Sequence, residues 1–198
     1  MDIVQVGEVV LRTKSKPLAR EEIGSRRTQD LITRMRDAMR NAPGVGLAAA
    51  QIGVPLSLAV IEDKPEYMKD VPEEILVSRG RRPVPFHVII NPELTLHPGT
   101  AIEFFEGCLS LAGFTAIVPR AQAVRVECLD QHGEPQVIEA SGWYARILQH
   151  EIDHLNGTLY IDRMRSRSFS SVDNHARFWK DKSIPEIGKE LDLTSTLT

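Results

Sequence analysis

Apolar positions along the chain follow two different periods, which predict both helices and strands. One face of the stretch 28–42 is apolar at helical spacing, through Leu31, Met35, Ala38 and Met39. This stretch is predicted to be a surface helix with one buried face, whose methionines fill the core rather than bind a metal. Short apolar or alternating runs predict strands at 56–62, 86–92, 101–105, 122–129 and 136–140. The last two flank a turn at 130–134 and therefore predict a β-hairpin.

The stretches between these elements have weaker patterns. The chain is predicted to enter the domain in extended form at 9–18 and to make a polar surface excursion at 63–85. It is predicted to leave the last long helix in extended form at 158–164. From 165 onward the chain is polar, with one amphipathic piece at 184–191 and predicted fraying at 192–198.

The strongest helical pattern, at 142–157, also carries candidate chemistry. Its apolar face is formed by Trp143, Ile147, Leu148, Ile152 and Leu155. His150 and His154 are four residues apart, so both lie on one face of a helix and can reach one metal ion. Glu151 is rotated away from that face and would act as a general base rather than as a ligand. The alternative is a core helix with two chance histidines, so a third ligand is needed to decide.

Composition limits the class of protein. The chain of 198 residues fits one domain, and its 24 basic and 27 acidic residues are intermingled, with a net charge of −3. This gives no electrostatic signal for nucleic acid or an anionic membrane. No segment has the pattern of a signal peptide or a membrane span. We expect an intracellular protein without a nucleic-acid or membrane partner, which could still be the mature part of a precursor.

The two cysteines have different expected roles. Cys108 follows Gly107 at a predicted strand end, where a sharp turn can present a thiolate, so it is the candidate third ligand. Cys128 shares a strand face with Val124 and Val126 and is predicted to be a core thiol. The remaining histidines lack partners at ligand spacing and are left out of the site: His87, His97, His132 and His175.

A run of small residues at 44–51 predicts close approach of the backbone to another element or to a bound peptide. Gln51 is its only polar side chain, and in the simplest alternative it bonds a neighbouring loop. A nucleotide loop is disfavoured, because a third glycine in register and a lysine are missing.

Three stretches together resemble the signature motifs of the peptide deformylases: Gly44-Val45-Gly46-Leu47-Ala48-Ala49-Ala50-Gln51, Glu106-Gly107-Cys108-Leu109-Ser110 and His150-Glu151-Ile152-Asp153-His154. The similarity runs from about residue 3 to 165, and details at 63–85, 112–114 and 142–147 resemble the mitochondrial and plant mitochondrial branch. It implies an α+β fold in which antiparallel β-sheets pack around a central metal-binding HExxH helix. We thus expect a catalytic domain at 1–165 and a polar extension, partly helical or frayed, at 166–198.

The resemblance also implies an activity, a hydrolase that removes the formyl group from the N-terminal formyl-methionine of nascent polypeptides. It implies one divalent metal, natively Fe(II), with zinc, nickel or cobalt able to bind the same ligands, which are Cys108, His150 and His154, with water as the fourth. Glu151 would be the acid/base, and the Gln51 side chain and the Leu109 backbone N–H would be the oxyanion donors. Substrate contacts would come from Val45, Gly46 and Gly107 for the backbone and from Phe104, Trp143, Arg146 and Ile147 for the methionine side chain.

Further expectations follow from the same resemblance. The protein would bind its substrate near the ribosome exit and would be a monomer or homodimer. It would be located in the cytoplasm of a bacterium or in a mitochondrion or plastid. Many bacterial members carry an arginine where Thr115 stands, so the usual contact beyond the methionine is not expected here. Two alternatives stay open: an HExxH zinc endopeptidase, and a metal-stabilised non-enzymatic peptide-binding module, which would want four closed protein ligands.

Overall fold

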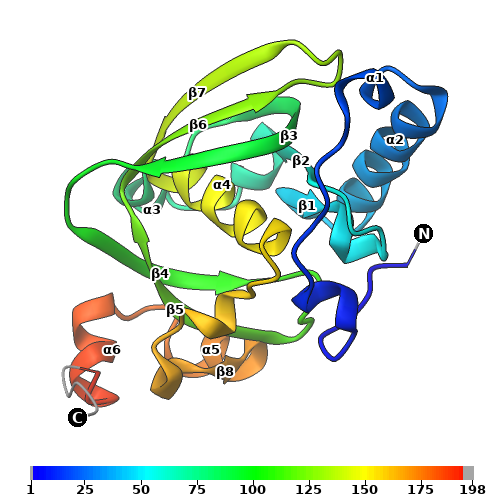
Figure 1. Cartoon of the computed structure of the whole chain (residues 1–198). Coiled ribbons are helices and arrows are strands. Elements are labelled where there is room, and N and C mark those ends of the chain that lie inside the picture. The colour runs from blue at the N-terminus through cyan, green and yellow to red at the C-terminus, as the bar shows by residue number, and fades with distance from the viewer. Residues whose placement is uncertain (1, 194–198) are drawn as a thin grey trace.

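The computed structural model describes residues 2–193 of the chain (Figure 1). Its helices are α1 Arg20–Ile23, α2 Arg26–Asn41, α3 Glu73–Arg79, α4 Gly142–Leu155, α5 Val172–Phe178 and α6 Ile184–Glu190. Its strands are β1 Gly46–Ala48, β2 Leu58–Asp63, β3 Val84–Leu96, β4 Ala101–Gly107, β5 Phe114–Ala121, β6 Ala123–Leu129, β7 Pro135–Ser141 and β8 Ser170–Ser171. None of the helices in this part of the chain is long and apolar enough to cross a membrane.

The strands form two antiparallel sheets that lie on either side of α4 (Figure 1). The larger sheet has the order β1-β2-β3-β6-β7, and the smaller sheet has the order β4-β5-β8. All strand pairs in both sheets are antiparallel, which confirms that part of the predicted fold. The predicted hairpin is β6–β7, in which Val126 lies opposite Ile138.

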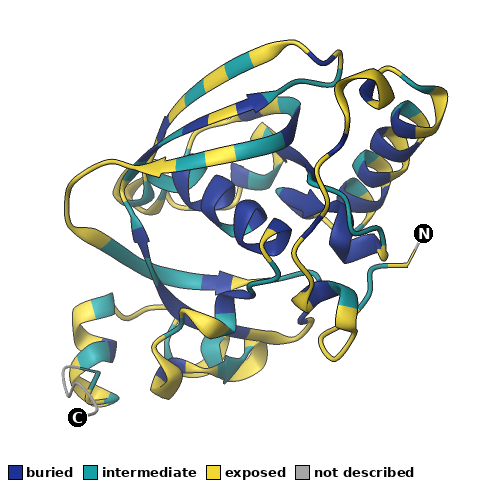
Figure 2. Cartoon of the chain, in the orientation of Figure 1, coloured by how far each residue is buried: buried dark blue, intermediate teal, exposed yellow. Residues whose placement is uncertain are grey.

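Helix α4 occupies the stretch predicted to be helical, and most of its surface is buried (Figure 2). Ile147, Leu148, Ile152 and Leu155 pack with strands of the larger sheet in one apolar cluster. The helix ends before Gly157, whose φ of 72° is the left-handed conformation expected of a C-terminal cap. A helix that is buried on most sides is typical of a core element, so α4 has little freedom to rotate about its axis.

Helix α2 covers the strands β1 to β3 with the face predicted from its spacing. Leu31, Met35 and Met39 are buried in the cluster that also contains Val60 and Ile90. The methionines therefore fill core space, as predicted. Ser25 caps the helix by accepting a hydrogen bond from the Thr28 N–H.

Several local predictions were wrong. The stretch 9–18 contains a 3₁₀ helix at Val9–Arg12, and the predicted extended exit contains another at Tyr160–Asp162. The excursion at 63–85 lies largely at the surface, as predicted, and it contains a 3₁₀ helix at Pro65–Met68 and the helix α3. Strand β5 was not predicted, because an apolar run of its length between Gly113 and Gln122 can also belong to a loop or a buried helix.

The C-terminal segment packs against the smaller sheet. Strand β8 pairs with β5 at Phe114 and Thr115, and the Ser168 hydroxyl accepts a hydrogen bond from the Ile117 N–H at 2.8 Å. The amphipathic piece predicted at 184–191 is α6. The fraying predicted at 192–198 concerns residues of which 194–198 lie outside the described part.

Candidate metal centre and active site

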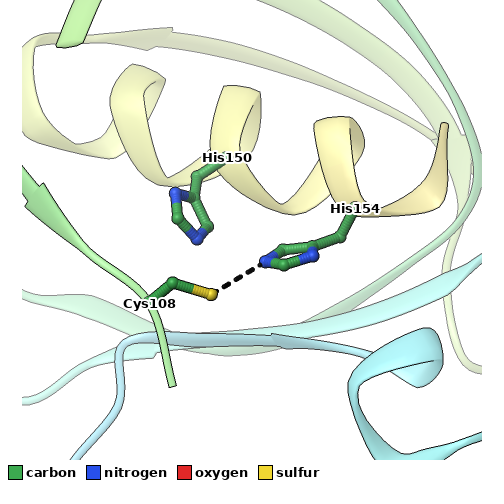
Figure 3. A group of neighbouring side chains, drawn as sticks. All are labelled: Cys108, His150 and His154. Carbon is green, nitrogen blue, oxygen red and sulfur yellow. Dashed lines mark hydrogen bonds between the residues drawn. The ribbon is translucent and has the colours of Figure 1, made fainter. Parts of the chain in front are cut away.

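Cys108, His150 and His154 meet between α4 and the end of β4 (Figure 3). One ligand atom from each residue lies within 4.8 Å of the others, and the Cys108 Sγ is 3.2 Å from the His154 Nε2. The two rings are brought together by one helical turn of α4, and the cysteine follows directly after Gly107, the last residue of β4. The third candidate ligand chosen from the sequence is thus beside the histidine pair.

Glu106 orients the first histidine, and this role was not predicted. Its Oε2 lies 3.0 Å from the His150 Nδ1, which leaves the Nε2 of that ring free for the cluster. Burial disfavours the charged carboxylate, but hydrogen bonds from His150 and Arg120 hold its pKa well below the usual range. A carboxylate behind a ligating histidine fixes its tautomer and raises its basicity. No local pattern in the sequence indicated this role, because Glu106 reaches His150 across 44 residues of chain.

A buried ion network continues behind Glu106. Arg120 donates to both Glu106 oxygens at 3.0 Å and to the Asp153 Oδ2 at 2.5 Å. Asp153 also accepts two hydrogen bonds from Arg163. Because Asp153 precedes His154 on α4, the same network ties the second histidine's turn of helix to β5. Removing one member would leave a buried charge unpaired, which costs about 3–5 kcal/mol.

The electrostatics of the two rings differ. Burial opposes protonation of His150, yet the Cys108 sulfur and the Glu106 carboxylate raise its pKa well above the usual value. Burial and the positive charge on His150 lower the pKa of His154 well below the usual value. A metal ion at this cluster would need a free nitrogen on each ring and the sulfur as a thiolate, so its binding would displace protons.

Glu151 is buried beside the cluster and has no partner for its Oε2 among the described residues. Burial raises the pKa of this carboxyl to about 7, which suits a group that takes up and releases a proton near neutral pH. Its other oxygen lies against Gly46, where an added Cβ would be only 2.2 Å from the Oε1. The close approach predicted for 44–51 is therefore the approach of Gly46 to Glu151.

Gln51 and Leu109 lie beside Cys108. The Gln51 Oε1 accepts a hydrogen bond from the Ala48 N–H at 2.8 Å, so its amide Nε2 is turned toward Ser110 and Cys108, at 3.3 and 3.6 Å. The Leu109 carbonyl accepts a hydrogen bond from Gln5 at 3.0 Å. Its own N–H has no acceptor within residues 2–193.

A cavity of about 530 Å³ opens over these groups. The predicted site residues along its walls are Val45, Gly46, Gln51, Gly107, Cys108, Leu109, Trp143, Arg146, Ile147, His150 and Glu151. His154 is fully buried below the cavity. Phe104 is absent from the walls and instead lies behind Trp143, with 6.5 Å between the ring centroids.

Arg146 is more constrained than a pocket-lining role suggests. Its guanidinium is buried and donates to the Glu106 Oε1 at 2.6 Å and to the carbonyls of Val118 and Ile102. Only its remaining surface can contact a molecule in the cavity. Arg146 thus joins the cavity wall to the carboxylate that holds His150.

The residues present fit a divalent transition metal. A thiolate and two imidazoles are the donors preferred by zinc and ferrous iron, and three protein donors next to a cavity leave a position open for a reacting molecule. The Glu151 Oε2, which is buried without a partner, fits the same arrangement, because a molecule at the open position could supply the missing hydrogen bond.

The other thiol and imidazoles lie elsewhere, as predicted. Cys128 is buried in the core of the larger sheet, and burial raises its pKa to about 11. Within residues 2–193, the cluster of Cys108, His150 and His154 is the single group of acidic, thiol and imidazole side chains with metal-binding spacing.

Comparison with known proteins agrees with these motifs. The model of the family described as polypeptide deformylase matches residues 1–170. Peptide deformylase 1A, chloroplastic, of Solanum lycopersicum is 51% identical over 87% of this chain, which spans 62% of that relative's length. The mitochondrial peptide deformylase of Homo sapiens is 43% identical, with 86% of this chain and 70% of that one covered.

Solved structures agree as well. A class I type b peptide deformylase from Acinetobacter baumannii, bound to Met-Ala-Ser, superposes with a TM-score of 0.73 at 29% identity and covers 83% of this chain and 98% of its own. Sequence identity over most of the chain and the shared fold lead to one assignment. This chain belongs to the polypeptide deformylase family and groups with its plant organellar and mitochondrial members.

Proposed function

We propose that this chain is a metal-dependent hydrolase that removes the N-formyl group from the N-terminal formyl-methionine of nascent polypeptides and releases formate. One observation carries the proposal: the buried Glu151 carboxylate lies beside the Cys108, His150 and His154 cluster, at the base of a cavity of about 530 Å³. The Acinetobacter relative binds Met-Ala-Ser, a peptide with the sequence expected of such a product.

Cys108, His150 and His154 would hold one divalent ion, with Glu106 keeping the His150 ring in place. Such an ion supplies Lewis-acid chemistry, lowering the pKa of a water toward 7 and polarising a carbonyl. Fe(II) is the proposed native ion, and zinc, nickel and cobalt fit the same donors. Retention of stoichiometric metal by a Cys108→Ala variant would remove this ligand from the set.

Glu151 is proposed to move the proton. Its carboxylate accepts a proton from the attacking water and then gives it to the departing amine, so one residue serves both halves of the hydrolysis. A pKa near 7 makes both transfers accessible at neutral pH. Gly46 supports this role by leaving room for the carboxylate where any larger residue would displace it.

Gln51 and Leu109 are proposed to stabilise the oxygen that becomes negative during the reaction. An amide Nε2 fixed by the Ala48 contact and a backbone N–H without an acceptor are uncharged donors that need no reorganisation. The backbone of the peptide is proposed to pair with Val45, Gly46 and Gly107. Trp143, Ile147 and the accessible part of Arg146 line the methionine pocket, with Phe104 supporting Trp143 from behind.

The partner is proposed to be the N-terminus of a nascent chain near the ribosome exit. This protein is proposed to act there as a monomer or homodimer. Relatives in plastids, mitochondria and bacteria make an organelle or a bacterial cytoplasm the proposed location. An endopeptidase or a non-enzymatic binding module is not favoured by the family match.

The test is formate release from formyl-Met-Ala-Ser by protein purified anaerobically. We expect stoichiometric formate and free Met-Ala-Ser, and no release of acetate from acetyl-Met-Ala-Ser as the matched control. Cleavage of internal bonds in unformylated peptides, without formate, would support the endopeptidase and contradict the proposal.

A further inference from the structure

A smaller pocket of about 170 Å³ lies between α3 and the start of α4. Its polar lining comes from Ser78, Arg79, Arg120, Gln122, Ser141 and Arg146. The lining contains three arginines and no acidic residue, although Glu106, which is not part of the lining, bonds the guanidiniums of Arg120 and Arg146. A concave site with this composition attracts anions.

Arg79, the last residue of α3, has the unusual environment in this pocket. Its guanidinium lies over the ring of Trp143 at 5.0 Å and over the ring of Phe104 at 5.4 Å. It forms no hydrogen bond or ion pair with any other residue in the part of the chain that the structure describes. The aromatic faces stabilise the cation, but they leave its in-plane N–H groups without acceptors.

The neighbouring arginines differ because their charges are compensated. Arg81 forms a two-fold hydrogen bond with Asp63 at 2.8 Å, and Arg120 and Arg146 both bond Glu106. Burial, together with repulsion from Arg81 and Arg146, lowers the pKa of Arg79. The surplus positive charge of the pocket therefore belongs to Arg79, and an anion would relieve it.

We propose that this pocket binds a small oxyanion, of the size of formate or inorganic phosphate, through the Arg79 guanidinium and the neutral polar groups of Ser141 and Gln122. A guanidinium fork matches the spacing of carboxylate or phosphate oxygens, and the hydroxyl and amide groups supply further donors. The pocket is separate from the metal cluster, and its occupation needs no catalytic step.

Two residues connect the pocket to the substrate cavity. Arg146 lines both spaces, and Trp143 lines the cavity while its ring contacts Arg79. An anion that holds Arg79 in place also fixes the indole that forms part of the methionine pocket. The site therefore couples the local anion concentration to the shape of the main cavity.

Tryptophan fluorescence tests the proposal directly. The chain contains two tryptophans, so a Trp179→Phe background isolates the signal of Trp143. Protein in this background is titrated with sodium phosphate and, separately, with sodium formate, while sodium chloride keeps the ionic strength constant. We expect a saturable change with at least one of the two anions.

The matched variants are Arg79→Gln and Arg82→Gln. Arg82 is an exposed arginine three residues away that is absent from the pocket lining. We expect Arg82→Gln to bind as the unsubstituted protein does and Arg79→Gln to bind at least tenfold more weakly, because a charge-assisted hydrogen bond is lost. Arg79→Lys, which keeps the charge but loses the fork, is expected to give an intermediate affinity and serves if Arg79→Gln does not fold, as judged by circular dichroism.

The two titrations also identify the source of the anion. Saturation by formate alone indicates a site for a product-like carboxylate, and saturation by phosphate alone indicates a phosphate site. Absence of a saturable signal with either anion overturns the proposal. An affinity in Arg79→Gln equal to that of the unsubstituted protein also overturns it. The anion would then be bound elsewhere, for example at the cluster of Cys108, His150 and His154.

Discussion

At the scale of single residues, the site depends on two carboxyl groups that are buried although burial disfavours their charged form. Glu151 is enclosed without a partner for one oxygen, and Gly46 provides the space that makes this enclosure feasible. Glu106 is buried as an anion because three donors surround it, from His150, Arg120 and Arg146. Burial raises the pKa of both acids, but the shifts are opposite overall, because only at Glu106 do the donors and nearby cations outweigh the burial.

Glu151→Gln is expected to separate proton transfer from metal binding. The amide keeps the shape of the side chain but cannot accept the water proton, and general acid–base catalysis contributes about 10²–10⁴-fold. Since one residue is proposed to serve both transfers, kcat is expected to fall by at least about a thousandfold, while KM changes little. Metal content per chain should stay near that of the unsubstituted protein. A variant with full metal and more than about a tenth of the original kcat would show that another group is the base.

Gly46→Ala is expected to displace the Glu151 carboxylate, because the new Cβ would lie 2.2 Å from its Oε1. We expect kcat to fall by about a hundredfold, as for other small displacements of reacting groups. The control is Gly188→Ala in α6, where an added Cβ meets no atom within 4 Å. Steady-state kinetics of both variants provide the measurement, and equal activities would contradict the proposed closeness of Gly46 and Glu151.

At the scale of elements, the excursion at 63–85 supports the start of α4. Gly80 ends α3 in the left-handed conformation, and its backbone and that of Arg79 lie against Gly142. Asp63 and Arg81 join the two ends of the excursion by a hydrogen-bonded ion pair. The excursion therefore supports Trp143 and the first turn of α4, the helix that carries both histidines.

Gly142→Ala is expected to weaken this contact. The residue has a φ of 62°, and an added Cβ would be 2.8 Å from the Arg79 carbonyl oxygen. Strain and the clash together are expected to lower the free energy of unfolding by about 2–4 kcal/mol. Gly113→Ala is the matched control, since it has a φ of 84° but no atom within 4 Å of the added Cβ. Urea unfolding should show a clearly larger loss of unfolding free energy for Gly142→Ala. Equal losses in the two variants would contradict the supporting role of the excursion.

The contact between α2 and β2 gives a prediction about pH. The Arg40 guanidinium donates two hydrogen bonds of 2.7 Å to Glu62 and thereby lowers the pKa of that carboxyl. A carboxyl with a depressed folded-state pKa stabilises the fold above its unfolded-state pKa, about 4.3, and the stabilisation is lost as the pH falls through the folded-state value.

The variant Arg40→Met is therefore expected to have a lower Tm than the unsubstituted protein at pH 6, with the difference narrowing below about pH 4. Thermal unfolding at several pH values measures it. Arg26→Met, at an exposed arginine on the same helix, is the control and should show no such pH-dependent difference. A constant difference between about pH 6 and pH 3 would mean that the ion pair does not act through the titration of Glu62.

At the scale of the whole molecule, the smaller sheet depends on the C-terminal segment. The Arg165 N–H donates to the Ile117 carbonyl, Ser168 accepts from the Ile117 N–H, and β8 continues the pairing with β5. Since β5 also supplies Arg120 to the ion network, the segment after residue 165 indirectly supports the cluster of Cys108, His150 and His154. The boundary predicted at 165 divides these hydrogen bonds.

Truncation after Arg165 is expected to leave several backbone groups of β5 without partners, at about 1–3 kcal/mol for each group that stays buried. Truncation after Lys182 keeps β8 and α5 and removes only α6 and the residues beyond it. We expect the chain that ends at 165 to have a markedly lower Tm than the chain that ends at 182. Equal thermal stability of the two would support an independent domain at 1–165.

Local patterns in the sequence determined the helices α2 and α4, the β6–β7 hairpin and the choice of Cys108, His150 and His154. These features depend on residues within one turn or one strand, where spacing translates directly into a shared face. The run of small residues at 44–51 also indicated a close approach of the backbone, but it did not identify Glu151 as the group approached.

Tertiary structure alone decided the partners that come from distant parts of the chain. Glu106 behind His150, Arg120 between Glu106 and Asp153, and Arg79 against Trp143 each join elements far apart in sequence. The strand β5 and the 3₁₀ helices also depend on contacts that a single stretch does not encode. Long-range ion pairs and aromatic contacts have no period, because they are set by how sheets and helices pack and not by the spacing of residues within one element.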